Sequence, residues 1–223
     1  MLDPEDLLAV RLYTMDKGEL TTVCYTTVNQ GLRDSVEQDQ GKKQQGAKIR
    51  EEWKFFILHL SSTISELKGT TGLHYRGQTY IPADTHTLKP GDVMTWPAFT
   101  SCSTNKGVAV NFGGGKLLYE IRIPSEYGGN IKEYSVYQGE DELVFPPFTS
   151  FPVDSAQKGK GGFEWYISLT CLEITATPQT SSPEMAIQEK AKEKPALEKA
   201  KETKKAAFFA FAFSHAGFFF SFS

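Results

Sequence analysis

The stretch FFILHLSSTISELKGTTGLHYRG, residues 55–77, contains the point at which the hydrophobic pattern of the chain changes. In its first part, apolar residues recur every three or four positions, which is the period of an amphipathic helix. The same period begins before this stretch, so we predict one long helix that ends before Gly69. Its apolar face consists of Ile49, Trp53, Phe56, Ile57, Leu60, Ile64 and Leu67. From about residue 72, the pattern is that of short strands.

The residues before this helix predict further helices. Asp3 followed by Pro4 is typical of a helix start, because Asp is a good N-cap acceptor and Pro suits the first turn. We expect a second helix over residues 20–32. The polar run EQDQGKKQQG, residues 37–46, is interpreted as a loop.

The residues after the long helix form aromatic and β-branched segments separated by Gly/Pro turns, which is typical of strands. Because helices come first and strands follow, the sequence predicts an α+β domain rather than an alternating parallel fold. We expect the N-terminal helices to pack against two small, mainly antiparallel sheets with a cleft between them. The strand segments are LHYRG (73–77), AFTSCS (98–103), LLYEIRI (117–123), DELVF (141–145) and FEWYISLTCLEI (163–174).

The chain has 223 residues and a formal net charge of −3, which fits one domain with a tail and gives no electrostatic footprint for nucleic acid. We place the domain at residues 1–175. We interpret residues 176–205 as a linker rich in Lys, Glu and Ala. We interpret residues 206–223 as an apolar aromatic tail. Whether the tail anchors the protein to a membrane or is a disordered extension stays open. Since the first residues do not resemble a signal peptide, the default expectation is a cytoplasmic protein.

The cysteines and histidines do not show the spacing of metal ligands, so we expect no metal site. The three cysteines are Cys24, Cys102 and Cys171. We interpret them as reduced thiols of an intracellular protein, with one disulfide and one leftover thiol as the alternative.

Four polar residues stand in strand-like sequence in a definite order: Arg76, Ser101, Glu140 and Glu142. A guanidinium matches phosphate oxygens two at a time, and the neighbouring Gly77 lets a ligand approach the backbone closely. Glu140 and Glu142 are two residues apart at the start of a strand, so we expect them to point the same way. Paired carboxylates repel each other, which favours a use such as stabilising an oxocarbenium-like centre.

Each of these residues also has an ordinary structural interpretation. Arg76 would pair with a carboxylate at a strand end, Ser101 would belong to a common Ser/Thr run, and the E-x-E segment would be a solvated acidic turn. Phe112, before the run GGG, either stacks on a flat heterocycle or is a core residue. That run does not fit a dinucleotide fingerprint, because no strand–GxGxxG–helix unit surrounds it.

Taken together, the motifs YRG (75–77), FTSCS (99–103) and E-x-E before a buried strand resemble the arginine-specific mono-ADP-ribosyltransferases of the R–S–E class. The segments AVNFGGGKLLYEI (109–121) and SVYQGEDELVFPPFTSFPV (135–153) are similar to that family too, as is the helical stretch near residues 12–33. The resemblance covers roughly residues 8–175. It implies an ADP-ribosyltransferase-like α+β fold whose two sheets flank an NAD cleft.

The resemblance implies a role in binding or cleaving NAD for each matched residue. Arg76 would hold the NAD pyrophosphate, and the backbone of Gly77 would read the nicotinamide amide. Ser101 would orient Glu142, which would bond the nicotinamide ribose and favour the departure of nicotinamide. Phe112 would stack near the nicotinamide. NAD is thus expected as the co-substrate, with NADP as an alternative and with no metal.

The same resemblance implies a protein acceptor with an exposed arginine. Glu140 would receive and position the acceptor guanidinium, and Tyr134 and Tyr137 would face the protein substrate. The sequence departs from the family pattern at two places. Cys102 stands where Thr is usual, on the strand face opposite the serines, and Gln138 replaces a residue that is often Pro, which puts the loop shape in question.

We therefore interpret the chain as an enzyme, an NAD(P)+–protein-arginine ADP-ribosyltransferase that releases nicotinamide. Two alternatives stay open: an NAD glycohydrolase with water as the acceptor, and a catalytically silent binding module. The presence of all four polar residues favours an enzyme. If the N-terminus is truncated, the alternative to a cytoplasmic protein is a secreted or surface enzyme with a Cys24–Cys171 disulfide.

Overall fold

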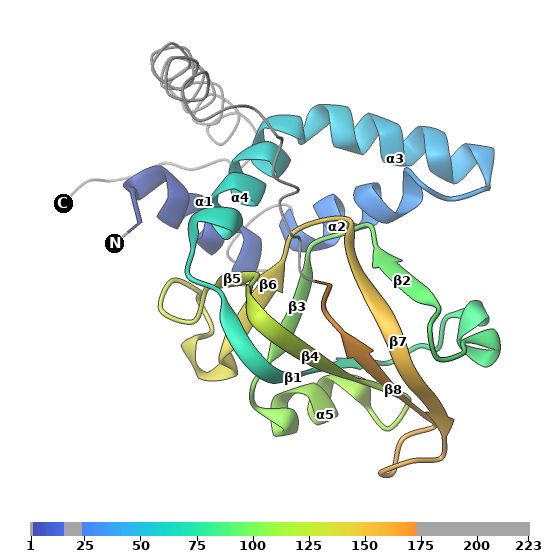
Figure 1. The fold of residues 1–223 in the computed structure, drawn as a ribbon. Coiled ribbons are helices and arrows are strands. Elements are labelled where there is room, and N and C mark those ends of the chain that lie inside the picture. Colours follow the sequence, from blue (N-terminus) through green and yellow to red (C-terminus); the bar gives the residue numbers. More distant parts are fainter. Residues whose placement is uncertain (1, 16–23, 173–223) are drawn as a thin grey trace, which may run out of the picture.

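The change of hydrophobic period coincides with the junction between a helical and a strand region. The computed structural model describes residues 2–15 and 24–172 (Figure 1). Its helices are α1 (Pro4–Thr14), α2 (Cys24–Asp34), α3 (Gln40–Glu52), α4 (Lys54–Glu66) and α5 (Lys106–Gly113). Its strands are β1 (Thr70–Gln78), β2 (Val93–Trp96), β3 (Thr100–Ser103), β4 (Leu117–Tyr127), β5 (Gly129–Asn130), β6 (Glu142–Phe145), β7 (Thr149–Lys158) and β8 (Trp165–Thr170). The predicted α+β class is confirmed.

Two predictions about the helical region were wrong. The run at residues 37–46 is not a loop, because α3 begins at Gln40. Lys and Gln are good helix formers, and the Asp39 side chain caps the helix by accepting a hydrogen bond of 2.8 Å from the Lys42 amide. The predicted single long helix is two helices, α3 and α4, which meet at Trp53 and run in different directions (Figure 1).

The strands form one hydrogen-bonded series in the order β2-β7-β8-β4-β1-β3-β6-β5. All neighbouring pairs are antiparallel except β4 with β8, as expected for a mainly antiparallel arrangement. The expected separation into two small sheets was wrong, because β1 joins them. β1 pairs with β4 along most of its length, whereas one residue pair, Tyr75 with Ser103, links it to β3.

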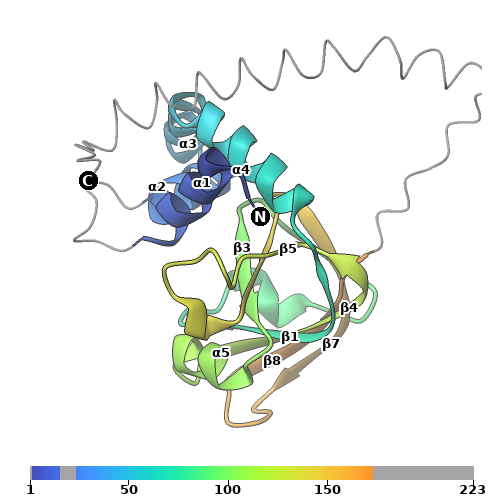
Figure 2. The same ribbon diagram turned by 90° about the vertical axis from the view of Figure 1, so that its left-hand side faces the viewer.

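The helices α1 to α4 lie together on one side of the strands, and α5 lies on the opposite side (Figure 2). The helical core includes Val10, Phe56 and Leu60, and it also takes in Phe99 and Val144 from the strand region. A second core lies among the strands and includes Cys102, Tyr119 and Phe151 among its members. Strands β3 and β6 therefore lie between two packed cores.

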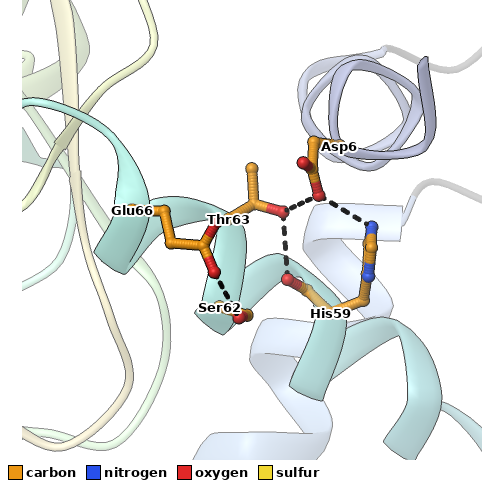
Figure 3. A network of polar contacts seen from close by, with 5 residues as sticks. All are labelled: Asp6, His59, Ser62, Thr63 and Glu66. Carbon is orange, nitrogen blue, oxygen red and sulfur yellow. Dashed lines mark hydrogen bonds and ion pairs between the residues drawn. The ribbon is translucent and has the colours of Figure 1, made fainter. Parts of the chain in front are cut away.

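A polar network fixes α1 against α4 (Figure 3). The Thr63 hydroxyl donates a hydrogen bond of 2.9 Å to the Asp6 carboxylate, and His59 Nε2 lies 3.1 Å from the same oxygen. On α4, the Ser62 hydroxyl separately donates a hydrogen bond of 3.3 Å to the Glu66 carboxylate. Because the Thr63 side chain is buried, this pairing specifies where α1 lies on the helical layer.

The remaining predictions, which concern the C-terminal part of the chain, fall outside the described residues. These are the linker at 176–205, the tail at 206–223 and the domain boundary at Thr175, which stay predictions. The described part of the chain contains no helix that is both long and apolar enough to span a bilayer.

Candidate active site

Three of the four predicted polar residues come from neighbouring strands in the order β1-β3-β6: Arg76, Ser101 and Glu142. Arg76 Nη1 donates a hydrogen bond of 2.9 Å to the carbonyl oxygen of Ser101. The guanidinium carbon lies 6.0 Å from the centre of the Trp96 ring, in the range of a cation–π contact. The sheet order therefore brings together side chains that are 25 to 66 residues apart in the sequence.

Glu142 is held by two serine side chains. The register pairs Ser103 of β3 with Glu142 of β6, and Ser101 lies two residues from Ser103 on the same strand face, as predicted. Both Ser101 and Ser135 hydrogen-bond to the Glu142 carboxylate.

The charge state of Glu142 is set by opposing effects. Burial raises the pKa of the Glu142 carboxyl above its ordinary value, and the hydrogen bond from Ser101 lowers it. The neighbouring charge of Glu140 raises this pKa further, whereas the Ser135 hydrogen bond and the Arg76 charge lower it. A carboxyl with a raised pKa beside a second carboxyl and a guanidinium is typical of functional sites.

Glu140 lies close to Glu142, but not for the predicted reason. It ends a short 3-10 turn, η2 (Gln138–Glu140), and Asp141 adopts a left-handed conformation with φ of 47° before β6 begins. Strand alternation therefore does not relate the two carboxylates. Ser103 fixes the turn instead, because its hydroxyl donates a hydrogen bond of 2.5 Å to the carbonyl of Glu140.

Gly77 has a packing reason to be glycine. A Cβ built on it would lie 1.8 Å from the carbonyl oxygen of Ala109 and 2.4 Å from the Gly113 amide, both in α5. Helix α5 thus rests directly on the backbone of β1 beside Arg76. The expected contact between this backbone and the nicotinamide amide stays a prediction.

The three aromatic residues predicted for ligand contacts lie in different settings. Tyr134 packs against the helical core, whereas the ring of Tyr137 is 40% exposed. Tyr137 is therefore the more exposed of the two, and contact of either ring with a protein substrate stays a prediction. Phe112 is 58% exposed on α5, one residue before Gly113, so it is not the core residue of the alternative interpretation.

Sequence reasoning assigned no role to several residues that lie at this site: Tyr13, Thr14, Trp96 and Ser135. The Tyr13 hydroxyl contacts the Ser101 side chain, and burial raises the pKa of Tyr13 to about 12. Thr14 accepts a hydrogen bond of 3.2 Å from the Val136 amide. The stretch at residues 12–33 was noted for its resemblance to the family, but nothing in the sequence alone shows that the end of α1 touches β3.

The cysteines play no visible part in this arrangement. Cys102 and Cys171 are free and buried, and Cys102 belongs to the core among the strands, on the face opposite Ser101. Burial raises the pKa of the Cys102 thiol far above its ordinary value. The Cys24 side chain lies outside the described residues. Among residues 2–15 and 24–172, no group of three or more His, Cys, Asp or Glu side chains could hold a metal ion.

A pocket of about 740 Å³ lies elsewhere on the domain, where the end of α4 meets β4 and the segment before β7. Its lining includes Leu67, Tyr127 and Phe148 but none of the predicted site residues. We place the site by the polar contacts around Glu142, because that is where the chemical groups converge.

The strand order and the convergence of a guanidinium, a serine and two carboxylates define the class of protein: an ADP-ribosyltransferase-like domain. Comparison with known proteins agrees, since the model of the family described as NAD:arginine ADP-ribosyltransferase matches residues 1–177. The chain belongs to this family.

Two curated relatives and one crystal structure illustrate the similarity. The putative NAD(+)–arginine ADP-ribosyltransferase Vis of Vibrio splendidus is 28% identical over 165 residues, which cover 70% of this chain and 63% of the relative. The NAD(P)(+)–arginine ADP-ribosyltransferase 2 of Gallus gallus is 38% identical over 77 residues, 34% of this chain and 24% of the relative. The chain thus matches less than two thirds of the length of either. A crystal structure of Vis with an inhibitor has a TM-score of 0.61 at 26% identity, covering 81% of this chain and 78% of that one.

Proposed function

We propose that this chain is an NAD-dependent arginine mono-ADP-ribosyltransferase, which moves ADP-ribose from NAD to a protein arginine and releases nicotinamide. The observation that carries the proposal is the setting of Glu142, a carboxylate held by two serines between a second carboxylate and a guanidinium. Family membership supports it. So does the fact that Vis, 26% identical to this chain, has been crystallised with agmatine, a small guanidinium compound.

The proposed reaction breaks the bond between the ribose carbon and the nicotinamide nitrogen. Nicotinamide leaves with the bonding electron pair, so positive charge develops on the ribose. A fixed, ionised Glu142 lowers the energy of that charge, and its restraint by Ser101 and Ser135 means that little reorganisation is needed. A guanidinium nitrogen of the acceptor then bonds to the same carbon and loses a proton.

The residues around Glu142 fit the two substrates by charge. A guanidinium has five N–H donors, and the contact with the Ser101 carbonyl uses one of them, so Arg76 suits the NAD phosphates. Glu140 is anionic and lies beside Glu142, which suits a cationic acceptor. The exposed ring of Tyr137 lies three residues before Glu140 in the same loop, where a protein substrate would dock.

The test is to incubate the full chain with labelled NAD and agmatine, with NADP in a parallel reaction. We expect an ADP-ribosyl–agmatine adduct together with free nicotinamide. Free ADP-ribose without adduct would replace the proposal with an NAD glycohydrolase. Neither product would mean a catalytically silent module. An Arg76→Lys variant is the matched control, because it keeps the charge but loses the planar fork, and we expect a higher KM for NAD.

A further inference from the structure

The C-terminal end of α1 places two buried side chains against two different parts of the site. Tyr13 and Thr14 are the last residues of this helix, and both are buried. The helix itself is fixed by the contacts of Asp6 with His59 and Thr63. The end of α1 is packed into the helical core through Leu12 and Tyr13, so it can hold the site from one side.

Tyr13 reaches the strand that carries Ser101. The Asn29 side chain donates a hydrogen bond of 3.1 Å to the Tyr13 hydroxyl, and that hydroxyl is in hydrogen-bond contact with the Ser101 side chain. The Tyr13 ring also packs edge-on against Phe99, with 5.5 Å between ring centres. An ionised carboxylate only accepts hydrogen bonds, so Ser101 donates its single hydroxyl proton to Glu142. Ser101 therefore accepts from Tyr13, whose own oxygen accepts from Asn29.

Thr14 reaches the loop that leads to the carboxylates. Its hydroxyl donates to the Val10 carbonyl at 3.1 Å and accepts from the Val136 amide at 3.2 Å. Val136 follows Ser135, the second serine that hydrogen-bonds to Glu142. The Ser135 hydroxyl also accepts a hydrogen bond of 3.0 Å from the Tyr137 amide, so the loop is anchored on both sides of Val136.

We propose that Tyr13 and Thr14 are positioning residues for the reaction: Tyr13 orients Ser101, Thr14 anchors Ser135, and together they aim both serine hydroxyls at Glu142. The effect of these residues on catalysis rests on the proposed function, whereas their contacts with the two serine-bearing segments do not. Neither residue would touch NAD or the acceptor in this role. They act through the two serines.

The proposal predicts how the pKa of Glu142 changes when Tyr13 or Thr14 is replaced. The charged groups that face Glu142 are Arg76 from β1 and Glu140 from η2, with the ionisable Tyr13 of α1 and Cys102 of β3 also within reach. Arg76 and Glu140 are untouched by Tyr13→Phe and Thr14→Val. A hydrogen bond donated to a carboxylate stabilises its charged form. Loss of serine orientation should therefore raise the pKa of Glu142.

The first experiment is an NMR titration of the Glu142 carboxyl carbon, assigned by comparison with Glu142→Gln. We expect a higher pKa in Tyr13→Phe and in Thr14→Val than in the unchanged protein. Thr14→Ser keeps the hydroxyl and should restore the original value. Tyr166→Phe is the matched control, because it removes a tyrosine hydroxyl that donates to Glu120 at 2.6 Å, outside the site. This titration needs no catalytic turnover.

The second experiment measures NAD hydrolysis and transfer to agmatine against pH. Tyr13→Phe should lower kcat roughly tenfold with little change in KM for NAD, and should move the acid limb of the profile to higher pH. Adding Tyr13→Phe to Ser101→Ala should have little further effect, since Tyr13 acts through Ser101.

The outcomes separate the inference from the proposed function. An unchanged Glu142 titration in folded Tyr13→Phe and Thr14→Val overturns the inference, whatever the activity. Full additivity of Tyr13→Phe and Ser101→Ala also overturns it. If Tyr13→Phe does not fold, the contrast between Thr14→Val and Thr14→Ser decides the case. A shifted titration in a protein that neither transfers nor hydrolyses supports the positioning network and refutes the proposed function alone.

Discussion

Replacing Glu140 with Gln should separate transfer to arginine from cleavage of NAD. The substitution should remove only the side-chain charge, because the turn that carries Glu140 is held through the main-chain carbonyl of Glu140. The Ser103 hydroxyl donates to the Glu140 carbonyl and accepts a hydrogen bond of 2.9 Å from the Asn105 amide. Glutamine has nearly the same shape as glutamate, so the turn and the position of Glu142 should persist.

Two effects of different sign follow from the lost charge. A charge-assisted contact between Glu140 and a guanidinium is worth about 1.5–3 kcal/mol, so transfer should fall by roughly 10- to 150-fold. The negative charge of Glu140 also raises the pKa of Glu142. Without it, the pKa of Glu142 falls, and the ionised form persists to lower pH. The acid limb of NAD hydrolysis should therefore move to lower pH, with its plateau retained.

The assay follows both products from labelled NAD across pH, with and without agmatine. Equal losses of transfer and hydrolysis would refute the reasoning, because Glu140 would then shape the whole site rather than dock the acceptor. Unchanged transfer would show that the acceptor does not use this carboxylate. An acid limb that moves to higher pH would contradict the electrostatic relation between Glu140 and Glu142.

Three further changes test the site and the fold. Glu142→Gln should reduce both reactions by roughly 10²–10³ or more. It should nevertheless raise Tm at pH 7, since the raised pKa of Glu142 means that its ionised form costs stability, and this gain should vanish below the ordinary carboxyl pKa. Asp6→Ala should lower the free energy of unfolding by about 1–3 kcal/mol, because it removes the carboxylate partner of the buried Thr63 hydroxyl. Each kcal/mol corresponds to roughly 2–4 °C of Tm for a domain of this size. Lys54→Ala, which breaks an exposed ion pair, should change Tm little. Gly77→Ala should lower the free energy of unfolding by at least about 1–3 kcal/mol, because the added Cβ overlaps with α5. Gly139→Ala has open space around its Cβ and should leave stability unchanged. Equal Tm values for the two variants would contradict the packing argument.

Hydrophobic periodicity predicted most of the fold because it reports burial directly. The switch near residue 72 corresponds to the junction between α4 and β1, and the segment quoted at 98–103 contains β3. The errors arose where tertiary packing overrides local pattern. The run at 37–46 was interpreted as a loop because it is polar, and it also contains Gly41 and Gly46. Gly46 is instead buried against α2, where a Cβ would lie 2.3 Å from the Ser35 amide, so close helix packing explains the glycine.

The order of Arg76, Ser101 and Glu142 could be predicted from motifs, but their mutual geometry could not. Motif spacing along the chain carries no information on sheet order, and adjacency of these residues depends on β1, β3 and β6 being neighbours. The relation between Glu140 and Glu142 was misjudged for a local reason. Asp141 turns through the left-handed region, which Asp tolerates and which strand alternation does not anticipate.

The candidate site lies on the same faces of β3 and β6 that pack against the helical layer. Along β3 and β6, Phe99 and Val144 point into the helical core, while Cys102 and Leu143 point into the core among the strands. By alternation, Ser101 lies on the face of Phe99, and Glu142 lies on the face of Val144. The helical layer therefore ends where the site begins, and the last turn of α1 lies at that border. This explains why Tyr13 meets Ser101, and it agrees with our proposal that the end of α1 positions the candidate site.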